Sequence, residues 1–259
     1  MKIRNISKRQ STHGLTLIEL VVVLAILVAL AGLIILNLPS LLKKASGSTA
    51  ANTIQDISRA MNTLQTLKGN FPTAYDSLIE TDGTSLAALP AASKAQVAAT
   101  ALGTTAGDLG ALTSLGITSV CNLIPYPATA PDATWSVSTN ANIITLVAGT
   151  KLALVSDSVL KTKLIPNTAS YLGTPNIYIL GVGKVCTLVG AGSTLLEAPT
   201  RTGVSELDNS ANFYQRYCVA FVVDGLSATT RKARFLGALV PTKDGFQVTE
   251  DQTSLYQSN

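Results

Sequence analysis

Histidine is almost absent from this sequence, because the 259 residues contain one, His13. Downstream of position 13 the chain therefore cannot form a Ser-His or Cys-His nucleophile pair, or any metal site that needs an imidazole ligand. Gly181, Gly183 and Lys184 are spaced like part of a phosphate loop, but Val185 stands where that loop requires serine or threonine. We interpret this stretch as a glycine-rich bend between strands. The sequence thus predicts a protein that is not an enzyme and has no cofactor.

Charged and aromatic residues are also scarce, at 13% and 5% of the chain. The net charge of +4 comes from 19 basic and 15 acidic residues, and four of the basic ones stand in the first fourteen positions, where there is no acid. The rest of the chain is formally neutral, so we do not expect nucleic acid as a partner. Arg231, Lys232 and Arg234 form a short basic cluster, which we interpret as the solvated edge of a strand.

Cysteine is limited to Cys121, Cys186 and Cys218, which allow three different single disulfides with one thiol left over. We favour Cys186 with Cys218, because both lie in segments with the composition of strands. The alternative is that all three are buried as small apolar residues.

Acidic residues gather loosely in the C-terminal part of the chain, at Glu206, Asp208, Asp224, Asp244, Glu250 and Asp251. They lack the spacing of a calcium loop. We interpret them as solvated loop charges, with a structural calcium ion in the C-terminal loops as the alternative.

What the sequence has in abundance is one long apolar run. Residues 15–36 contain only two polar side chains, Thr16 and Glu19. As a helix the run is roughly 33 Å long, which predicts a transmembrane helix, since a bilayer core is about 30 Å thick. Lys2, Arg4, Lys8 and Arg9 precede the run. By the positive-inside bias they predict a single-pass protein with a cytoplasmic N-terminus and the bulk of the chain on the other side of the membrane.

The helical pattern continues beyond the apolar run. Ile54, Ile57, Met61 and Leu64 recur at helical spacing and predict one apolar face. Lys68, Gly69 and Pro72 then supply a cationic last turn, a capping glycine and a proline. We therefore expect one N-terminal helix of about fifty residues, whose second half packs on a globular head.

The remaining sequence is expected to form the globular head. Residues 84–120 are rich in Ala, Leu, Thr and Gly, and we interpret them as an insertion with short helices at 93–102 and 106–115. Runs of β-branched residues predict strands at 135–137, 143–147, 177–182, 185–189, 217–223, 233–240 and 246–249. The expected fold class is α+β, with a long N-terminal transmembrane helix packed on an antiparallel β-sheet.

The start of the apolar run, Gly14-Leu15-Thr16-Leu17-Ile18-Glu19-Leu20, resembles the class III signal of type IV prepilins and of the pseudopilins of type II secretion. The resemblance implies that a membrane aspartyl peptidase cuts between Gly14 and Leu15 and methylates the new amine of Leu15. Glu19 stands at the position of the family's glutamate, five residues into the mature chain. Leu15 departs from the phenylalanine usual at that position.

A second segment, Gly69-Asn70-Phe71-Pro72-Thr73, resembles the sequence that follows the long helix in major pseudopilins. The resemblance covers residues 1–80 by motif, and the rest only by general architecture. It implies a leader at 1–14, a transmembrane and polymerisation helix at 15–38, an amphipathic second half at 39–70 and a pilin-like α+β head at 71–259.

The position of Glu19 within the apolar run is also unusual on physical grounds. A carboxylate within an apolar span costs a few kcal/mol, and residues 15–36 offer it no basic side chain. The amine of Leu15, freed by cleavage and belonging to the same or a neighbouring subunit, is the nearest counter-ion, so pairing would couple charge relief to assembly. The plain alternative is a partly hydrated glutamate at the membrane interface.

The resemblance therefore implies a structural filament subunit. Its expected partners are homologous subunits, a prepilin peptidase, an inner-membrane assembly platform and membrane lipid. A minor pseudopilin that binds a secreted substrate, and a binding or enzymatic domain tethered by an uncleaved anchor, are the alternatives. The sequence leaves open which machine is served: secretion, adhesion, motility or DNA uptake.

Overall fold

The computed structural model describes residues 16–103, 107–123, 143–201 and 214–257. The chain divides into two compact units, Met1–Leu42 and Lys43–Asn259. The first is helical in its described part, and the second contains the sheet.

Helix α1, Leu17–Lys68, runs through 52 residues and belongs in part to each unit. It ends as the sequence predicts. Gly69 takes a left-handed backbone with φ of +73°, and its N–H donates to the carbonyl of Gln65 at 2.8 Å. Glycine adopts this conformation at little cost, so it closes the last turn and lets the chain leave toward Pro72.

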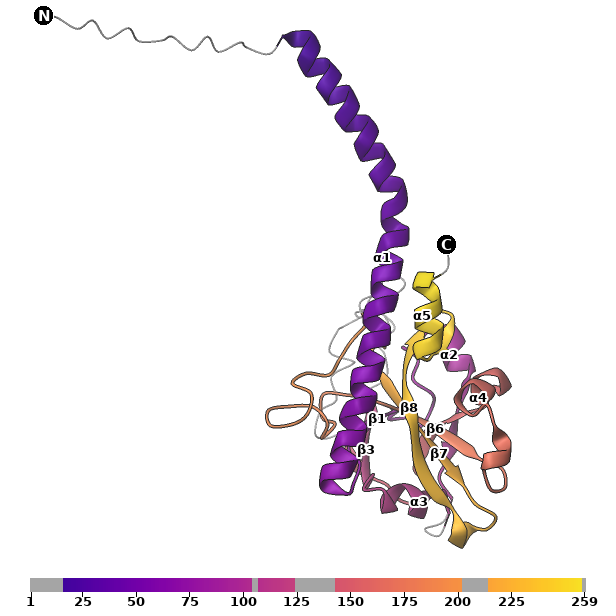
Figure 1. The fold of residues 1–259 in the computed structure, drawn as a ribbon. Helices are drawn as coiled ribbons and strands as arrows, with labels where there is room; N and C mark the ends of the chain where they lie inside the picture. Colours follow the sequence, from indigo (N-terminus) through magenta and orange to yellow (C-terminus); the bar gives the residue numbers. More distant parts are fainter. Residues whose placement is uncertain (1–15, 104–106, 124–142, 202–213, 258–259) are drawn as a thin grey trace, which may run out of the picture. The chain divides into compact units, whose positions relative to one another are not determined.

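The larger unit is built on a nine-stranded sheet (Figure 1). Along the main path the strand order is β4-β3-β1-β6-β7-β8-β9, while β5 pairs with both β2 and β6. In chain order the strands are β1 Tyr75–Glu80, β2 Val97–Ala101, β3 Ser119–Leu123, β4 Ile143–Thr145, β5 Lys151–Val155, β6 Asn176–Gly181, β7 Cys218–Asp224, β8 Lys232–Thr242 and β9 Gly245–Gln247. The helices beyond α1 are α2 Ala91–Ala95, α3 Asp108–Ser114, α4 Ser158–Leu164 and α5 Thr249–Gln257, with 3₁₀ turns at Thr168–Ser170 and Ala228–Thr230.

The expected antiparallel sheet is wrong, because this sheet is mixed. Strands β1 and β3 are parallel, with Tyr75 opposite Val120, whereas the other pairs of named strands are antiparallel. Parallel neighbours need a long crossover instead of a hairpin. Here the crossover contains α2, β2 and α3.

This crossover also overturns the interpretation of residues 84–120 as a helical insertion. The predicted helix at 106–115 is present as α3, but the predicted helix at 93–102 is a short helix followed by strand β2. Strands β2 and β3 each join the sheet. Cross-strand partners distant in the sequence therefore override local helix propensity.

Most of the strands predicted toward the C-terminus are present. Those at 177–182, 217–223, 233–240 and 246–249 correspond to β6, β7, β8 and β9, and that at 143–147 is shortened to β4. Residues 185–189 form turns instead of a strand. The strand predicted at 135–137 lies outside the described residues.

The second half of α1 covers one face of the sheet. Ile54, Ile57, Met61 and Leu64 are buried there, as their spacing predicts, in a cluster that includes Phe221 of β7. On the opposite face, Ala220 and Val222 pack in a second cluster with Leu160 of α4 and Phe246 of β9. The sheet is thus a central layer with an apolar core on each side.

The expectation of a transmembrane helix is contradicted as well. A span needs about 20 consecutive, predominantly apolar residues, and within the part of the chain that the structure describes no helix meets the required length and apolarity. The expectation counted the length of an apolar run that begins at Leu15, outside the described residues.

A buried ion pair joins strand β1 to the chain just before β7. The guanidinium of Arg216 lies 3.0 Å from the carboxylate of Asp76, and the Tyr214 hydroxyl donates to the same oxygen, Oδ2, at 3.0 Å. Both charged side chains are almost fully buried. Buried charges are tolerated when they are paired and hydrogen-bonded.

Glycines make the space for this ion pair. A Cβ added to Gly183 would lie 2.1 Å from Oδ1 of Asp76, and one added to Gly181 would lie 1.8 Å from the Tyr214 hydroxyl oxygen. A bend that brings a carboxylate against Gly183 does not suit a phosphate. Residues 181–184 therefore form a close-packed, glycine-rich segment at the end of β6, but residues 185–189 do not form the strand that was expected to follow it.

We expect Gly183→Ala to lower the free energy of unfolding of the full chain by about 2 kcal/mol or more, since the added methyl group must displace the buried Asp76 carboxylate. Urea denaturation monitored by circular dichroism measures this change. Gly103→Ala is the matched control, because its Cβ would meet nothing within 4 Å and Gly103 has no positive φ. Equal stabilities of the two variants would contradict the proposed packing.

Candidate functional site

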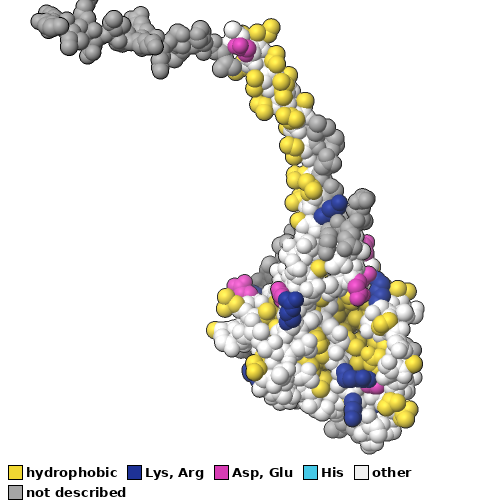
Figure 2. All heavy atoms as spheres, viewed as in Figure 1, with side chains coloured by type: hydrophobic (Ala, Val, Ile, Leu, Met, Phe, Trp, Pro, Cys, Tyr) yellow, Lys and Arg dark blue, Asp and Glu magenta, His cyan; other side chains and the backbone are white. Residues whose placement is uncertain are grey.

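The described first half of α1 exposes apolar side chains around its circumference. Leu17, Ile18 and Val28 are 80%, 71% and 71% exposed, and Ile34 and Ile35 are 64% and 66% exposed. Figure 2 shows apolar side chains along this part of the helix. Soluble monomers rarely expose a contiguous apolar surface of this extent, so such a surface marks an interaction site.

A capping box begins the helix. The backbone N–H and the hydroxyl of Thr16 donate to Oε2 of Glu19 at 2.8 and 2.9 Å, and the N–H of Glu19 approaches the Thr16 hydroxyl oxygen at 3.4 Å. These bonds supply partners for N–H groups that the first turn leaves unpaired. Glu19 therefore has a local structural role that the sequence analysis missed, although the Thr-x-x-Glu pattern before an apolar run was a sufficient signal.

The capping box uses one oxygen of the carboxylate. Both hydrogen bonds from Thr16 reach Oε2, and within the described residues no hydrogen bond reaches Oε1. Glu19 is exposed, and it is the only charged side chain among residues 15–42. The arrangement can therefore accept a further donor without losing the cap. The predicted processing residues, Gly14 and Leu15, lie outside the described residues, so cleavage between them stays a prediction.

The segment after α1 ties the end of this helix to the sheet. Phe71 is buried, and its ring packs against those of Phe221 and Phe235 with centroids 5.5 and 5.8 Å away. The Thr73 hydroxyl accepts the backbone N–H of Ser119 at 2.9 Å. The aromatic and hydroxyl positions of the Gly69–Thr73 motif thus have structural roles.

The predicted Cys186–Cys218 disulfide is not formed, because Cys186 and Cys218 are both free and buried, and Cys121 is buried as well. Cys186 belongs to the apolar cluster on the α1 face of the sheet, while Cys218 belongs to the cluster on the other face. The sheet therefore separates the two sulfur atoms. Burial raises the pKa of the Cys186 thiol to about 12, so this cysteine stays protonated and is a poor nucleophile at neutral pH.

The C-terminal acids are dispersed. Asp224 accepts the N–H of Leu172 at 3.0 Å and pairs with Arg234 at 2.8 Å; although burial opposes its ionisation, these two donors lower the pKa of Asp224. Asp251 pairs with Lys163 at 2.7 Å. Among the described residues no three His, Cys, Asp or Glu side chains converge as a metal site requires. Glu206 and Asp208 lie outside those residues.

A carboxylate-centred cluster lies at the start of α3. Asp108 accepts the Asn176 amide at 2.7 Å and the Tyr178 hydroxyl at 2.5 Å, and its other oxygen faces Nε of Arg231 at 2.5 Å. Burial, and then the hydrogen bond to Asp108, raise the pKa of Tyr178 well above its ordinary value. The hydrogen bonds of Asp108 therefore tie α3 to β6, although the buried Nε of Arg231 faces this carboxylate without a hydrogen bond. Arg231 of the basic sequence cluster belongs to this carboxylate-centred cluster.

Comparisons with protein-family models, curated proteins and solved structures find no match to this chain.

Two substitutions separate the cap from the charge of Glu19. We expect Thr16→Val to speed hydrogen exchange of the amides in the first turn of α1 several-fold, because the loss of a capping side chain costs about 1 kcal/mol. Glu19→Gln should leave exchange near the wild-type rate, since glutamine also completes a capping box. Faster exchange in Glu19→Gln than in Thr16→Val would show that the charge, and not the cap, holds the first turn.

Proposed function

We propose that this chain is a structural, non-enzymatic subunit of a type IV pilus-like or type II secretion filament, processed by a prepilin peptidase and polymerised through its N-terminal helix. The exposed apolar surface of α1 carries the proposal. Its support from the sequence is the resemblance of residues 14–20 to the prepilin signal.

Helix-to-helix packing is the burial that fits this surface. Apolar side chains cover the described first half of α1 on more than one face, so a single flat contact would leave much of the surface in water. Several parallel copies packed side by side would cover every face and remove the apolar area from solvent.

Glu19 supplies the register in this proposal. In a bundle of identical helices the carboxylate would lie in an apolar setting, where an unpaired charge is costly. The methylated amine of a neighbour's Leu15 is the cation that processing would create. Oε1 can accept it while Oε2 keeps its bonds to Thr16. The proposed partners are therefore homologous subunits, a prepilin peptidase and an inner-membrane assembly platform.

Processing is tested by the N-terminus of the mature chain. We expect mass spectrometry of protein from the native cell to find an N-methylated Leu15 as the first residue. Gly14→Leu should leave residues 1–14 attached, because a bulky residue would block the cut, while Ser11→Leu, three residues upstream, should be cut normally. A wild-type chain that retains Met1 would overturn the proposed processing.

Assembly is tested by the two substitutions that separate cap from charge. Glu19→Gln keeps the cap and loses the charge, so we expect its sheared filament yield to fall at least tenfold. Thr16→Val loses the cap and keeps the charge, so its yield should stay within about twofold of wild type, because a cap is worth about 1 kcal/mol. Equal yields from Glu19→Gln and wild type would refute pairing with the neighbour's amine. A loss in Thr16→Val as large as that in Glu19→Gln would mean that assembly needs the cap as much as the charge.

A further inference from the structure

Strand β8 has an open edge. Strand β7 pairs with β8 from Lys232 to Leu239 on one side, whereas β9 on the other side pairs with only its last three residues, 240–242. The chain then turns into α5 at Thr249 and leaves the edge. Within the described part of the chain, no strand covers this side of residues 232–239. An open edge presents main-chain donors and acceptors that an added strand can use.

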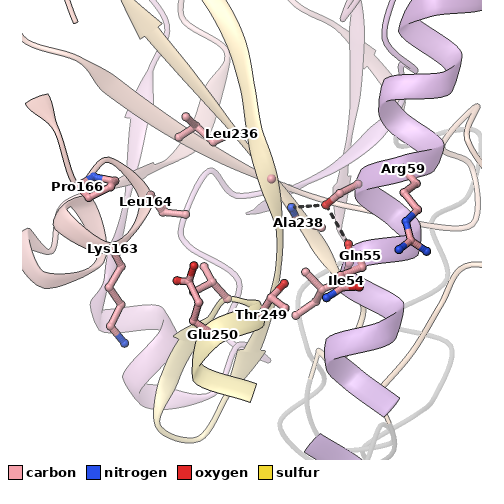
Figure 3. A pocket seen from close by; sticks show the side chains of 13 residues that line it. Ile54, Gln55, Arg59, Lys163, Leu164, Pro166, Leu236, Ala238, Thr249 and Glu250 are labelled. Carbon is pink, nitrogen blue, oxygen red and sulfur yellow. Dashed lines mark hydrogen bonds between the residues drawn. The ribbon is translucent and has the colours of Figure 1, made fainter. Parts of the chain in front are cut away.

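A groove follows this edge. A hollow of about 550 Å³ opens at Leu236, Gly237 and Ala238, with α1 on one side of β8 and the ends of α4 and α5 on the other (Figure 3). A second hollow, of about 330 Å³, lies beside Lys232 and Arg234 farther back along the strand. Lys163, Leu164 and Pro166 line part of the first hollow, and Ser170 and Leu172 line part of the second. The two hollows therefore succeed each other along one strand.

The floor of the groove is main chain. A Cβ built on Gly237 would meet no atom within 4 Å, so the backbone is bare at this point. The next amide, that of Ala238, donates to the Ser58 hydroxyl of α1 at 3.2 Å, and Ser58 in turn donates to the carbonyl of Ile54 at 2.9 Å (Figure 3). At Ala238 the Ser58 hydroxyl of α1 thus accepts the edge N–H in place of a carbonyl from a neighbouring strand.

The side chains that line the two hollows carry an excess of positive charge. Arg59, Lys163, Lys232 and Arg234 outnumber Glu250 and Asp224. Arg59, Lys163 and Arg234 already pair with Asp56, Asp251 and Asp224. Of the four cations, only Lys232, at the far end of the edge, has no ion pair with a carboxylate among the described residues. Leu164, Leu236 and Val248 add apolar surface at the other end.

We propose that the open edge of β8 binds an extended acidic peptide segment of a partner protein by strand addition, antiparallel to β8 and with its acidic residues toward Lys232. An extended chain alone can bond to the edge in a ladder. Strand β9 already pairs with β8 in the antiparallel direction, and Lys232, which has no ion pair among the described residues, favours acidic residues. The groove lies wholly within the unit Lys43–Asn259, so this inference does not depend on filament assembly.

The probe is a fluorescein-labelled synthetic peptide, Val-Thr-Val-Thr-Val-Glu-Glu, titrated against the full-length protein by fluorescence polarisation. We expect saturable binding with a Kd in the micromolar range. Replacing the central threonine–valine pair by two prolines removes two main-chain donors, and replacing both glutamates by lysines reverses the charge. Each changed peptide should bind at least tenfold more weakly. Equal binding of the proline peptide would overturn strand addition.

Two protein variants locate the site. Gln55→Trp should fill the larger hollow and weaken binding at least tenfold, while Asn52→Trp, one turn earlier on α1 and outside the hollow, should not. Lys232→Glu should weaken binding about fivefold through lost charge complementarity, while Lys94→Glu on exposed α2 should leave it unchanged. Wild-type affinity in both Gln55→Trp and Lys232→Glu would place the peptide elsewhere and refute the proposal.

Hydrogen exchange tests whether the peptide binds at the edge of β8. Bound peptide should slow the exchange of the amides at 234–237. If these amides are already slow and become faster on dilution of the protein without peptide, a second copy of the chain covers the edge, and the peptide proposal is overturned. A failure in this assay leaves cleavage at Gly14 and filament yield untouched, so the two proposals fail separately.

Discussion

The apolar surface of helix α1 is the constraint on which the rest of this molecule depends. In the second half of the helix the apolar residues keep to one face, and the sheet buries them against Phe221 and its neighbours. In the first half they spread around the axis and are exposed. The hydrophobic effect makes such exposure unfavourable in water. One continuous helix thus has a surface that its own chain covers and a surface that the described chain leaves uncovered.

The sheet can serve as a base for α1 in part because its buried carboxylate, Asp76, is paired with Arg216 and hydrogen-bonded by Tyr214. Asp76 and Arg216 would be costly in the core if either lost its partner, and close approach at Gly181 and Gly183 lets Tyr214 reach the same carboxylate. This pairing ties β1 to the chain just before β7, while β1 itself pairs with β3 and β6. The mixed sheet is therefore held by a polar tie as well as by its two apolar cores.

Local patterns in the sequence predicted the elements whose causes are local. The helical spacing of Ile54, Ile57 and Met61 predicted the face that α1 buries, and Gly69 followed by Pro72 predicted where the helix ends. The β-branched runs predicted β6, β7 and β8. Strand β2 was missed because its Ala- and Thr-rich segment becomes a strand only through a partner distant in the chain, and β1, β3 and β5 were not predicted either. The cysteine prediction failed for a similar reason, because sequence does not reveal which side of the sheet a residue faces until its register is known.

The candidate site was predictable only in part. Composition and position singled out Glu19 as an isolated charge, and that description was incomplete because Thr16 lies three residues earlier and shares one carboxylate oxygen. The capping role of this residue and the pairing proposed for it are compatible. A carboxylate in the first turn is favoured by the partial positive charge of the helix N-terminus, so the cap orients it before any partner is present. Pre-orientation lowers the entropy that a second donor would lose on binding. A helix start that already fixes its only acid is therefore suited to recognising a cation at a set height along the helix axis.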